Sequence, residues 1–169
     1  MRLPAGLVFR RLKPSDSTLE LTWLVRRAYR RLANLGLRYR GTVQDEDETR
    51  LRIARGECFV GVRRARFVAT VTLACGVPVR GCSWYNLPGV ALFNQFAVAP
   101  ELQDAGVGTA LLGLIEARAR ELGAREIACD TAEPANLLVD WYLRLGYRPV
   151  ETVRWRDVNY RSVIMSKAL

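Results

Sequence analysis

A short segment, Gly106-Val107-Gly108, constrains the fold of this chain more than any other. It follows an apolar, strand-like stretch over Ala91–Val98 and opens a long amphipathic run that ends at Gly123. The first turn of a helix leaves backbone N–H groups unpaired, and the helix dipole adds partial positive charge there. Because glycine has no Cβ, an anion can approach this backbone closely. The segment therefore predicts a strand, a loop and a helix that together form an anion site.

The remaining patterns predict one sheet covered by helices. Apolar residues at helical spacing and helix-ending residues predict helices over Leu19–Leu35, Gln44–Arg55, Gly106–Leu122 and Ala135–Leu145. Shorter apolar runs predict strands over Leu7–Leu12, Cys58–Val62, Phe67–Cys75, Ala91–Val98 and Glu126–Cys129, with two more inside Arg148–Lys167. The expected fold class is α/β, with a single central mixed, mostly antiparallel sheet of about seven strands and helices on both faces.

Composition excludes several kinds of chemistry. The chain has no histidine, and its four cysteines form no C-x-x-C pair. We therefore expect no metal site, and catalysis by Ser-His-Asp or Cys-His groups is excluded. No apolar run approaches the roughly 18 residues of a membrane helix, and no leader-like segment is recognised. These features predict a cytoplasmic protein without a membrane partner.

The charge is strongly positive, which favours an anionic partner. The formal net charge is +9, from 24 arginines and 2 lysines against 17 acidic residues. The arginines are spread along the chain and form no block of five or more. This distribution suits an anionic cofactor better than nucleic acid, so an RNA-associated protein is the weaker alternative.

Two interpretations of the glycine loop compete. The first is the dinucleotide fingerprint G-x-G-x-x-G, in which Asp130 would bind a ribose. The third position of that fingerprint is Leu111 rather than glycine. The stretch from Val98 to Gly106 is also too long for a tight turn between strand and helix. The dinucleotide interpretation is therefore disfavoured.

The second interpretation accounts for more of the chain. Gln103-x-x-Gly106-x-Gly108, after a strand ending in Ala97-Val98-Ala99-Pro100-Glu101, resembles the pyrophosphate loop of the GNAT superfamily of acyl-CoA N-acyltransferases. Downstream, Tyr142-x-x-x-Gly146-Tyr147 resembles the second motif of that superfamily, and the element order agrees along nearly the whole chain. The resemblance implies a single GNAT-like N-acetyltransferase domain over residues 1–169, with its fourth and fifth strands splayed apart.

The resemblance also implies a reaction and a coenzyme. The expected activity is transfer of acetyl from acetyl-CoA to a primary amine of a small molecule or peptide, by direct attack in a ternary complex. Asn136 is expected either to contact the coenzyme or to cap the following helix. The implied coenzyme-binding residues are Phe96, Ala97, Val98, Gln103, Ala105, Gly106, Val107, Gly108, Thr109, Ala110, Asn136 and Tyr142.

Catalytic roles follow from the same resemblance. Tyr142 is the expected acid for the leaving thiolate, because a phenol has an intrinsic pKa near 10. Asp130 and Glu133 are candidate bases acting through water, since the fourth strand carries Asn94 and Gln95 where many relatives have a carboxylate.

A second departure lies in the loop, where Asp104-Ala105 stands in place of the usual basic residue. Together the two departures keep a non-catalytic acyl-CoA-binding or regulatory module open as an alternative. Assembly into a homodimer is also open.

Overall fold

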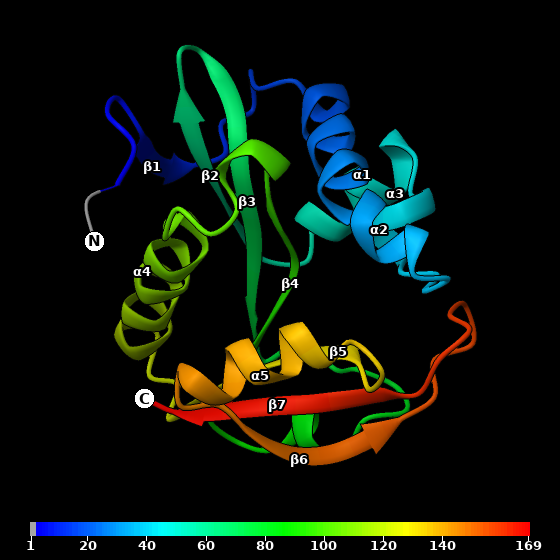
Figure 1. The fold of residues 1–169 in the computed structure, drawn as a ribbon. Coiled ribbons are helices and arrows are strands. Elements are labelled where there is room, and N and C mark those ends of the chain that lie inside the picture. Colours follow the sequence, from blue (N-terminus) through cyan, green and yellow to red (C-terminus); the bar gives the residue numbers. More distant parts are fainter. Residues whose placement is uncertain (1–2) are drawn as a thin grey trace.

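Seven strands form one sheet in the order β1-β2-β3-β4-β5-β7-β6 within residues 3–169, the part of the chain that the computed structural model describes (Figure 1). The β4–β5 pair is parallel, and the other neighbouring pairs are antiparallel. The predicted mixed, mostly antiparallel sheet is thereby confirmed. The strands are β1 (Val8–Arg11), β2 (Glu57–Arg63), β3 (Arg66–Cys75), β4 (Val90–Val98), β5 (Glu126–Ala132), β6 (Arg148–Val153) and β7 (Ser162–Ala168).

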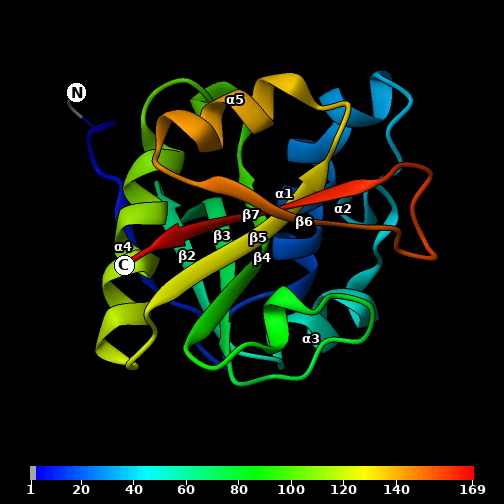
Figure 2. The same cartoon turned by 90° about the horizontal axis from the view of Figure 1, so that it is seen from below.

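Helices cover both faces of this sheet. Figure 2 shows α4 on one side of the β2–β4 half and α1, α2 and α3 on the other, while α5 lies beside β5. The helices are α1 (Thr18–Asn34), α2 (Arg40–Val43), α3 (Glu46–Ile53), α4 (Val107–Glu121) and α5 (Asn136–Arg144). Two short 3₁₀ turns, η1 (Trp84–Asn86) and η2 (Pro100–Leu102), complete the elements.

Local sequence explains where two of these helices start. The Ser17 hydroxyl accepts a hydrogen bond from the Glu20 N–H at 3.1 Å, which caps α1. The Asp45 carboxylate accepts one from the Glu48 N–H at 2.8 Å and caps α3. Each cap satisfies an N–H group that the helix itself leaves unpaired.

Strands β4 and β5 separate soon after they begin. They pair only at Val90–Glu126, Ala91–Ile127 and Leu92–Ala128. Further along, the register between β3 and β4 shifts at a bulge, where Gln95 takes a left-handed backbone with φ of +53°. The predicted splay of the fourth and fifth strands is present, and it opens the centre of the sheet.

Two differences from the sequence-based expectations go beyond shifts of one or two residues at the ends of elements. The single turn of α2 was not predicted, because four residues are too few to show helical periodicity. Strand β5 was expected to stop at Cys129 but continues to Ala132, since β7 pairs with it through Ser162. This extension places Asp130 inside a strand rather than in a loop. No helix in the described range is long and apolar enough to cross a membrane.

A buried apolar cluster and one ion-pair group fix α4 against the sheet. Leu111 and Ile115 of α4 are fully buried in the same cluster as Phe93. At the other end of the helix, the Arg118 guanidinium donates to both carboxylate oxygens of Glu57 on β2, at 2.8 and 2.9 Å. These contacts hold the helix whose first turn forms the glycine loop.

Candidate active site

The glycine loop presents a row of free backbone donors at the start of α4. Gly106 is the N-cap residue and has a φ of +77°, a conformation that glycine adopts without strain. The first helical bond runs from the Ala110 N–H to the Gly106 carbonyl at 3.0 Å. The N–H groups of Gly106, Val107, Gly108 and Thr109 therefore have no partner within the helix. The Ala110 N–H, by contrast, is already used.

The residues before Gly106 shape the loop. The Gln103 side-chain amide donates to the Val98 carbonyl at 3.1 Å and so ties the loop to the end of β4. Ala105 packs against the main apolar cluster. Asp104 is exposed, has a φ of +62° and does not cap α4. Gln103 and Asp104 thus carry polar side chains in the loop, whereas Ala105 is part of the apolar packing. The coenzyme contacts of Gln103 and Ala105 stay predictions.

The backbone N–H and C=O groups of successive β4 residues point alternately towards β3 and towards the split between β4 and β5. The Ala99 N–H donates to Val68 of β3 at 2.8 Å, and Ala97 is paired with Thr70 of the same strand. Successive residues of a strand direct their backbone groups to opposite sides, so the Val98 N–H points into the gap beside β5. The Phe96 carbonyl accepts a hydrogen bond from the Tyr29 hydroxyl at 3.0 Å. Of the predicted coenzyme-binding residues on β4, Val98 thus offers a free backbone donor, whereas the backbone of Ala97 faces β3.

Two aromatic rings stand over the loop. Phe96 of β4 and Trp141 of α5 stack with ring centroids 5.8 Å apart. A Cβ placed on Gly108 would lie 3.3 Å from the Phe96 ring and 3.5 Å from the Trp141 ring. Glycine at this position therefore lets the first turn of α4 approach both rings.

Tyr142 lies on the same face of the sheet, inside the core. Its side chain is buried, and its ring packs against Phe93, Trp141 and Tyr147. Its hydroxyl lies beside the Cys129 thiol of β5. Burial raises the pKa of the Tyr142 phenol well above its ordinary value, so the group is protonated at neutral pH.

The two candidate bases occupy different surroundings. Asp130 is half-buried, and its carboxylate accepts hydrogen bonds from the Trp155 indole at 3.0 Å and from the Tyr85 hydroxyl at 3.4 Å. Burial raises the pKa of Asp130 above its ordinary value. Glu133 is exposed, and the Arg161 guanidinium donates to it at 2.7 Å, which lowers the pKa of Glu133.

Asn136 is the first residue of α5 and is exposed. The N-cap position is held by Ala135, and no side chain caps this helix. The alternative in which Asn136 caps the helix is therefore wrong. Its contact with a coenzyme stays a prediction.

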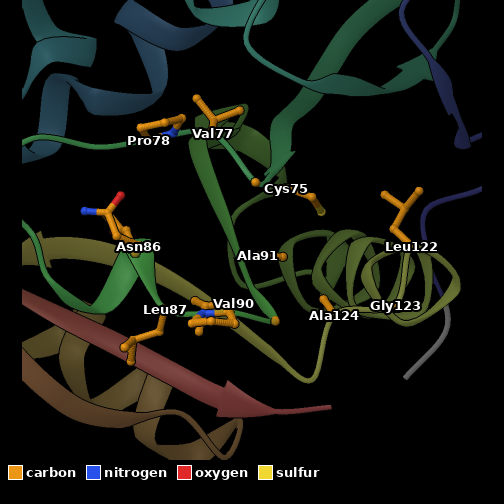
Figure 3. Close-up of a pocket in the computed structure, with 14 residues that line it drawn as sticks. Cys75, Val77, Pro78, Asn86, Leu87, Val90, Ala91, Leu122, Gly123 and Ala124 are labelled. Atoms are coloured by element: carbon orange, nitrogen blue, oxygen red, sulfur yellow. The ribbon is translucent and has the colours of Figure 1, made fainter.

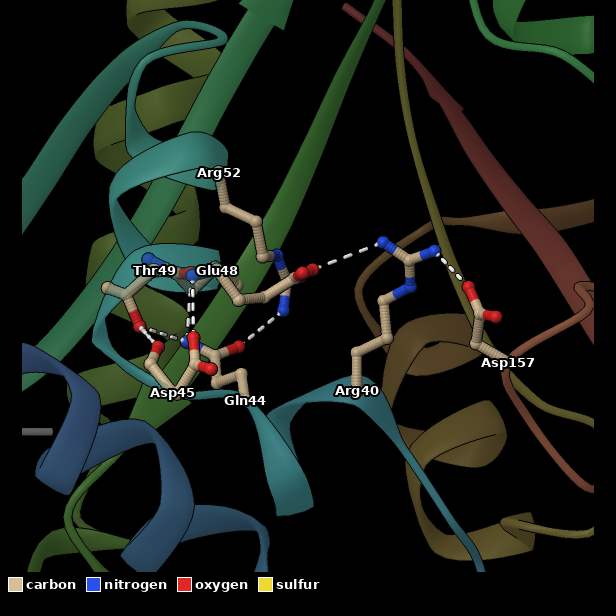
Figure 4. A network of polar contacts seen from close by, with 8 residues as sticks. Arg40, Gln44, Asp45, Glu48, Thr49, Arg52 and Asp157 are labelled. Carbon is tan, nitrogen blue, oxygen red and sulfur yellow. Dashed lines mark hydrogen bonds and ion pairs between the residues drawn. The ribbon is translucent and has the colours of Figure 1, made fainter.

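A polar network on the opposite face of the split was missed by the sequence analysis. Gln44, before α3, donates to Thr49 at 2.7 Å and to Gln95 at 3.2 Å, while Arg52 donates to Gln44 at 2.6 Å (Figure 4). Nearby, the Tyr39 hydroxyl meets Thr131 at 2.9 Å. The contacts from Gln44 to Gln95 and from Tyr39 to Thr131 join residues 51 and 92 positions apart, so no local sequence pattern indicates them.

One hollow in the described part of the chain lies away from the glycine loop and the candidate catalytic residues. It has a volume of about 390 Å³ and lies where β4 begins and α4 ends, between residues such as Cys75, Val90 and Leu122 (Figure 3). The glycine loop is at the other ends of both elements. The coenzyme-loop features and the candidate catalytic groups therefore belong to the split in the sheet.

A fold with a split β4–β5 pair and a glycine loop opening α4 is the arrangement that the resemblance implied. The chain matches the Acetyltransferase (GNAT) family over residues 19–147, more than half of its length. It belongs to that family and is an acyltransferase of the GNAT N-acetyltransferase type. Members of the family use acetyl-CoA.

Individual relatives agree with this assignment. The S-(2-succino)cysteine N-acetyltransferase of Bacillus subtilis is 30% identical over 140 residues, which cover 80% of this chain and 79% of the relative. The ribosomal-protein-S18-alanine N-acetyltransferase from Escherichia coli has a similar fold, with a TM-score of 0.72 and 16% identity over 96% of this chain and 93% of its own. A GNAT family acetyltransferase from Elizabethkingia anophelis, solved with acetyl-CoA bound, gives a TM-score of 0.69 and 12% identity over 98% of this chain and all of its own.

Proposed function

We propose that this protein transfers an acetyl group from acetyl-CoA to a primary amine of a small molecule or peptide, by direct attack in a ternary complex. One observation carries the proposal: a candidate acid and a candidate base lie on opposite faces of one strand beside the split. Tyr142 contacts Cys129, whereas Asp130 is the next residue of β5 and therefore points to the other face. Tyr142 can then protonate the leaving thiolate from one side of the strand, while Asp130 accepts a proton from the attacking amine on the other.

The loop residues fit a diphosphate and its attached arm. The unpaired N–H groups from Gly106 to Thr109 and the positive end of the α4 dipole suit the two phosphates. The Val98 N–H, free at the edge of the split, is placed to donate to a carbonyl oxygen of the ligand. Asp104 is exposed and takes no part in capping, so it need not oppose the phosphates.

The reaction forms a bond between nitrogen and the acyl carbon and breaks the carbon–sulfur bond. In our proposal Asp130 accepts the proton of the attacking amine, directly or through water, because burial raises its pKa and makes it the stronger base of the two candidates. Glu133 is held by Arg161 and is the weaker candidate. Tyr142, protonated at neutral pH, donates to the sulfur as it leaves.

Thermal unfolding with and without ligands tests the first half of the proposal. A ligand that binds only the folded state raises the melting temperature. Acetyl-CoA and free CoA should each raise it, whereas NADH should not. The absence of a shift with both CoA compounds would contradict the proposal.

Turnover separates an enzyme from a binding module. Purified protein with acetyl-CoA and a broad amine panel, including S-(2-succino)cysteine, should release CoA only when an acceptor is present. Coenzyme binding without turnover on any amine would instead support a non-catalytic acyl-CoA-binding module. That alternative is motivated by the lack of a carboxylate in the Val90–Gln95 part of β4 and by Asp104-Ala105 in the glycine loop.

A further inference from the structure

Arg52 lies on the amine side of the split, near Asp130, and makes no direct ion pair within residues 3–169. It lies in α3 and is largely shielded from solvent, yet it belongs to none of the ion pairs found among residues 3–169. Its one side-chain hydrogen bond in that range is donated to the side-chain Oε1 of Gln44, at 2.6 Å. A guanidinium has five N–H donors, so most of the donor capacity of Arg52 remains free.

The neighbouring arginine shows the contrast. Arg40 is more exposed than Arg52 but is paired with two carboxylates, Glu48 at 3.2 Å and Asp157 (Figure 4). A solvated cation needs no partner. A cation shielded from water has lost hydration free energy, which destabilises the fold unless an opposite charge pairs with it. The distribution of partners is therefore the reverse of what stability alone would favour. It leaves the inner guanidinium without a direct ion pair among residues 3–169, although the Glu48 and Asp130 carboxylates act on its charge from further away.

Hydrogen bonds fix that charge over the opening between β4 and β5. Gln44, which accepts from Arg52, donates in turn to the Gln95 side-chain oxygen at 3.2 Å. Gln95 forms the β4 bulge and is fully buried, and its side-chain nitrogen has no hydrogen-bond partner. The Asp130 and Glu48 carboxylates and the neutral Tyr29 hydroxyl also lie within electrostatic range of Arg52, so these groups share one neighbourhood.

We propose that Arg52 binds a carboxylate of the amine acceptor, and that the acceptor is a small amino acid-type molecule with a carboxylate close to its primary amine. This inference rests on the proposed function, in which the amine approaches Asp130. A guanidinium matches a carboxylate through two parallel N–H bonds. One guanidinium without a direct ion pair also matches a single carboxylate, because the neighbouring Arg40 is already paired with Glu48 and Asp157. A peptide N-terminus has no carboxylate beside its amine and fits less well.

Matched acceptors test the inference directly. Methionine and methioninamide, and leucine and leucinamide, each share one side chain, and the amide lacks the negative charge of the acid. Wild-type protein should acetylate the acids with kcat/KM values at least about tenfold higher than the amides, since a charge-assisted pair adds about 1.4 kcal/mol or more. O-phosphoethanolamine, with a phosphate in place of the carboxylate, should be a poorer acceptor than the amino acids. Equal rates for acids and amides, or preference for the phosphate, would overturn the proposal.

Two variants assign the effect to Arg52. Arg52→Gln should raise KM for the acids about tenfold or more and leave the rates with the amides nearly unchanged. Arg55→Gln is the matched control, because Arg55 is exposed, follows α3 and makes no side-chain hydrogen bond among the described residues. The melting shift with CoA should be the same in both variants, which shows that each is folded. An equal loss of activity with the acids and with the amides in Arg52→Gln would overturn the proposed role of Arg52.

Failure of the proposed function would look different. A wild-type protein that acetylates no amine but binds CoA would refute transferase activity on these acceptors. The role of Arg52 is then read from calorimetric titration of methionine and leucine into the CoA-bound protein. Binding that Arg52→Gln removes and Arg55→Gln keeps would support the carboxylate site. Absence of binding to the wild type would refute it.

Discussion

Replacement of Gly108 by valine tests whether the glycine loop binds the phosphates of the coenzyme, because the loop has little space for a side chain at this position. The Cβ of any side chain at this position would lie 3.3 Å from the Phe96 ring, which leaves little space. The two further methyl groups of valine must then push α4 away from the rings or project towards the bound phosphates. Either outcome disturbs the free N–H groups at the start of α4.

The size of the effect follows from the donors that are lost. A hydrogen bond to a charged group contributes about 1.5–3 kcal/mol. If two of the four free N–H groups from Gly106 to Thr109 lose their phosphate contacts, the loss is about 3–6 kcal/mol. This corresponds to a rise in the dissociation constant of about 10²–10⁴-fold. Calorimetric titration of acetyl-CoA into the variant measures it.

Gly113→Val is the control for this experiment. Gly113 lies in the same helix, and a Cβ there would meet nothing within 4 Å. Valine in a helix is more favourable than glycine by a few tenths of a kcal/mol, so the control should be at least as stable as the wild type. It should bind acetyl-CoA normally. A folded Gly108→Val protein whose dissociation constant stays within about threefold of the wild-type value would refute the loop as the phosphate site.

Three further predictions concern single side chains. Hydrogen bonds from Arg118 hold the pKa of Glu57 at about 2, below the ordinary 4.5, so its stabilising effect is present above pH 4.5 and is lost as the pH falls towards 2. In urea unfolding, Glu57→Gln should therefore lower stability by about 1–2 kcal/mol at pH 7, a value reduced for partial exposure, and by much less at pH 3; an equal loss at both pH values would refute this reasoning. Tyr142→Phe should lower kcat about 10²-fold in steady-state assays with little change in the KM for acetyl-CoA, and an unchanged kcat would remove Tyr142 as the acid. Asp130→Asn should lower kcat by a similar factor while Glu133→Gln stays within about twofold, and the reverse order would exchange the two bases.

The parts of the site that were predictable from sequence rest on local rules. Gly106 and Gly108 stand at the start of an amphipathic run, so a helix with open donors follows from residues adjacent in the chain. The overall mixed sheet followed from the order of apolar runs. The separation of β4 from β5 was expected only through the resemblance to a family, because nothing local specifies where parallel strands part.

Long-range contacts account for what the sequence did not indicate. Gln95 carries the left-handed bulge of β4, although glutamine has no special preference for that conformation. Its side chain is held by Gln44, which is 51 residues away. Arg52 stood out from the other arginines only when its neighbours were known. Such groups are defined by what surrounds them in space, so periodicity and spacing give no signal.

The most direct test of the account is mass spectrometry of all components after the protein is mixed with acetyl-CoA and an amino acid acceptor. Direct attack in a ternary complex predicts an N-acetylated amine and free CoA, with the protein itself unmodified whether or not the acceptor is present. Acetyl groups on Cys129 or Tyr142, or release of CoA that does not depend on the amine, would contradict it.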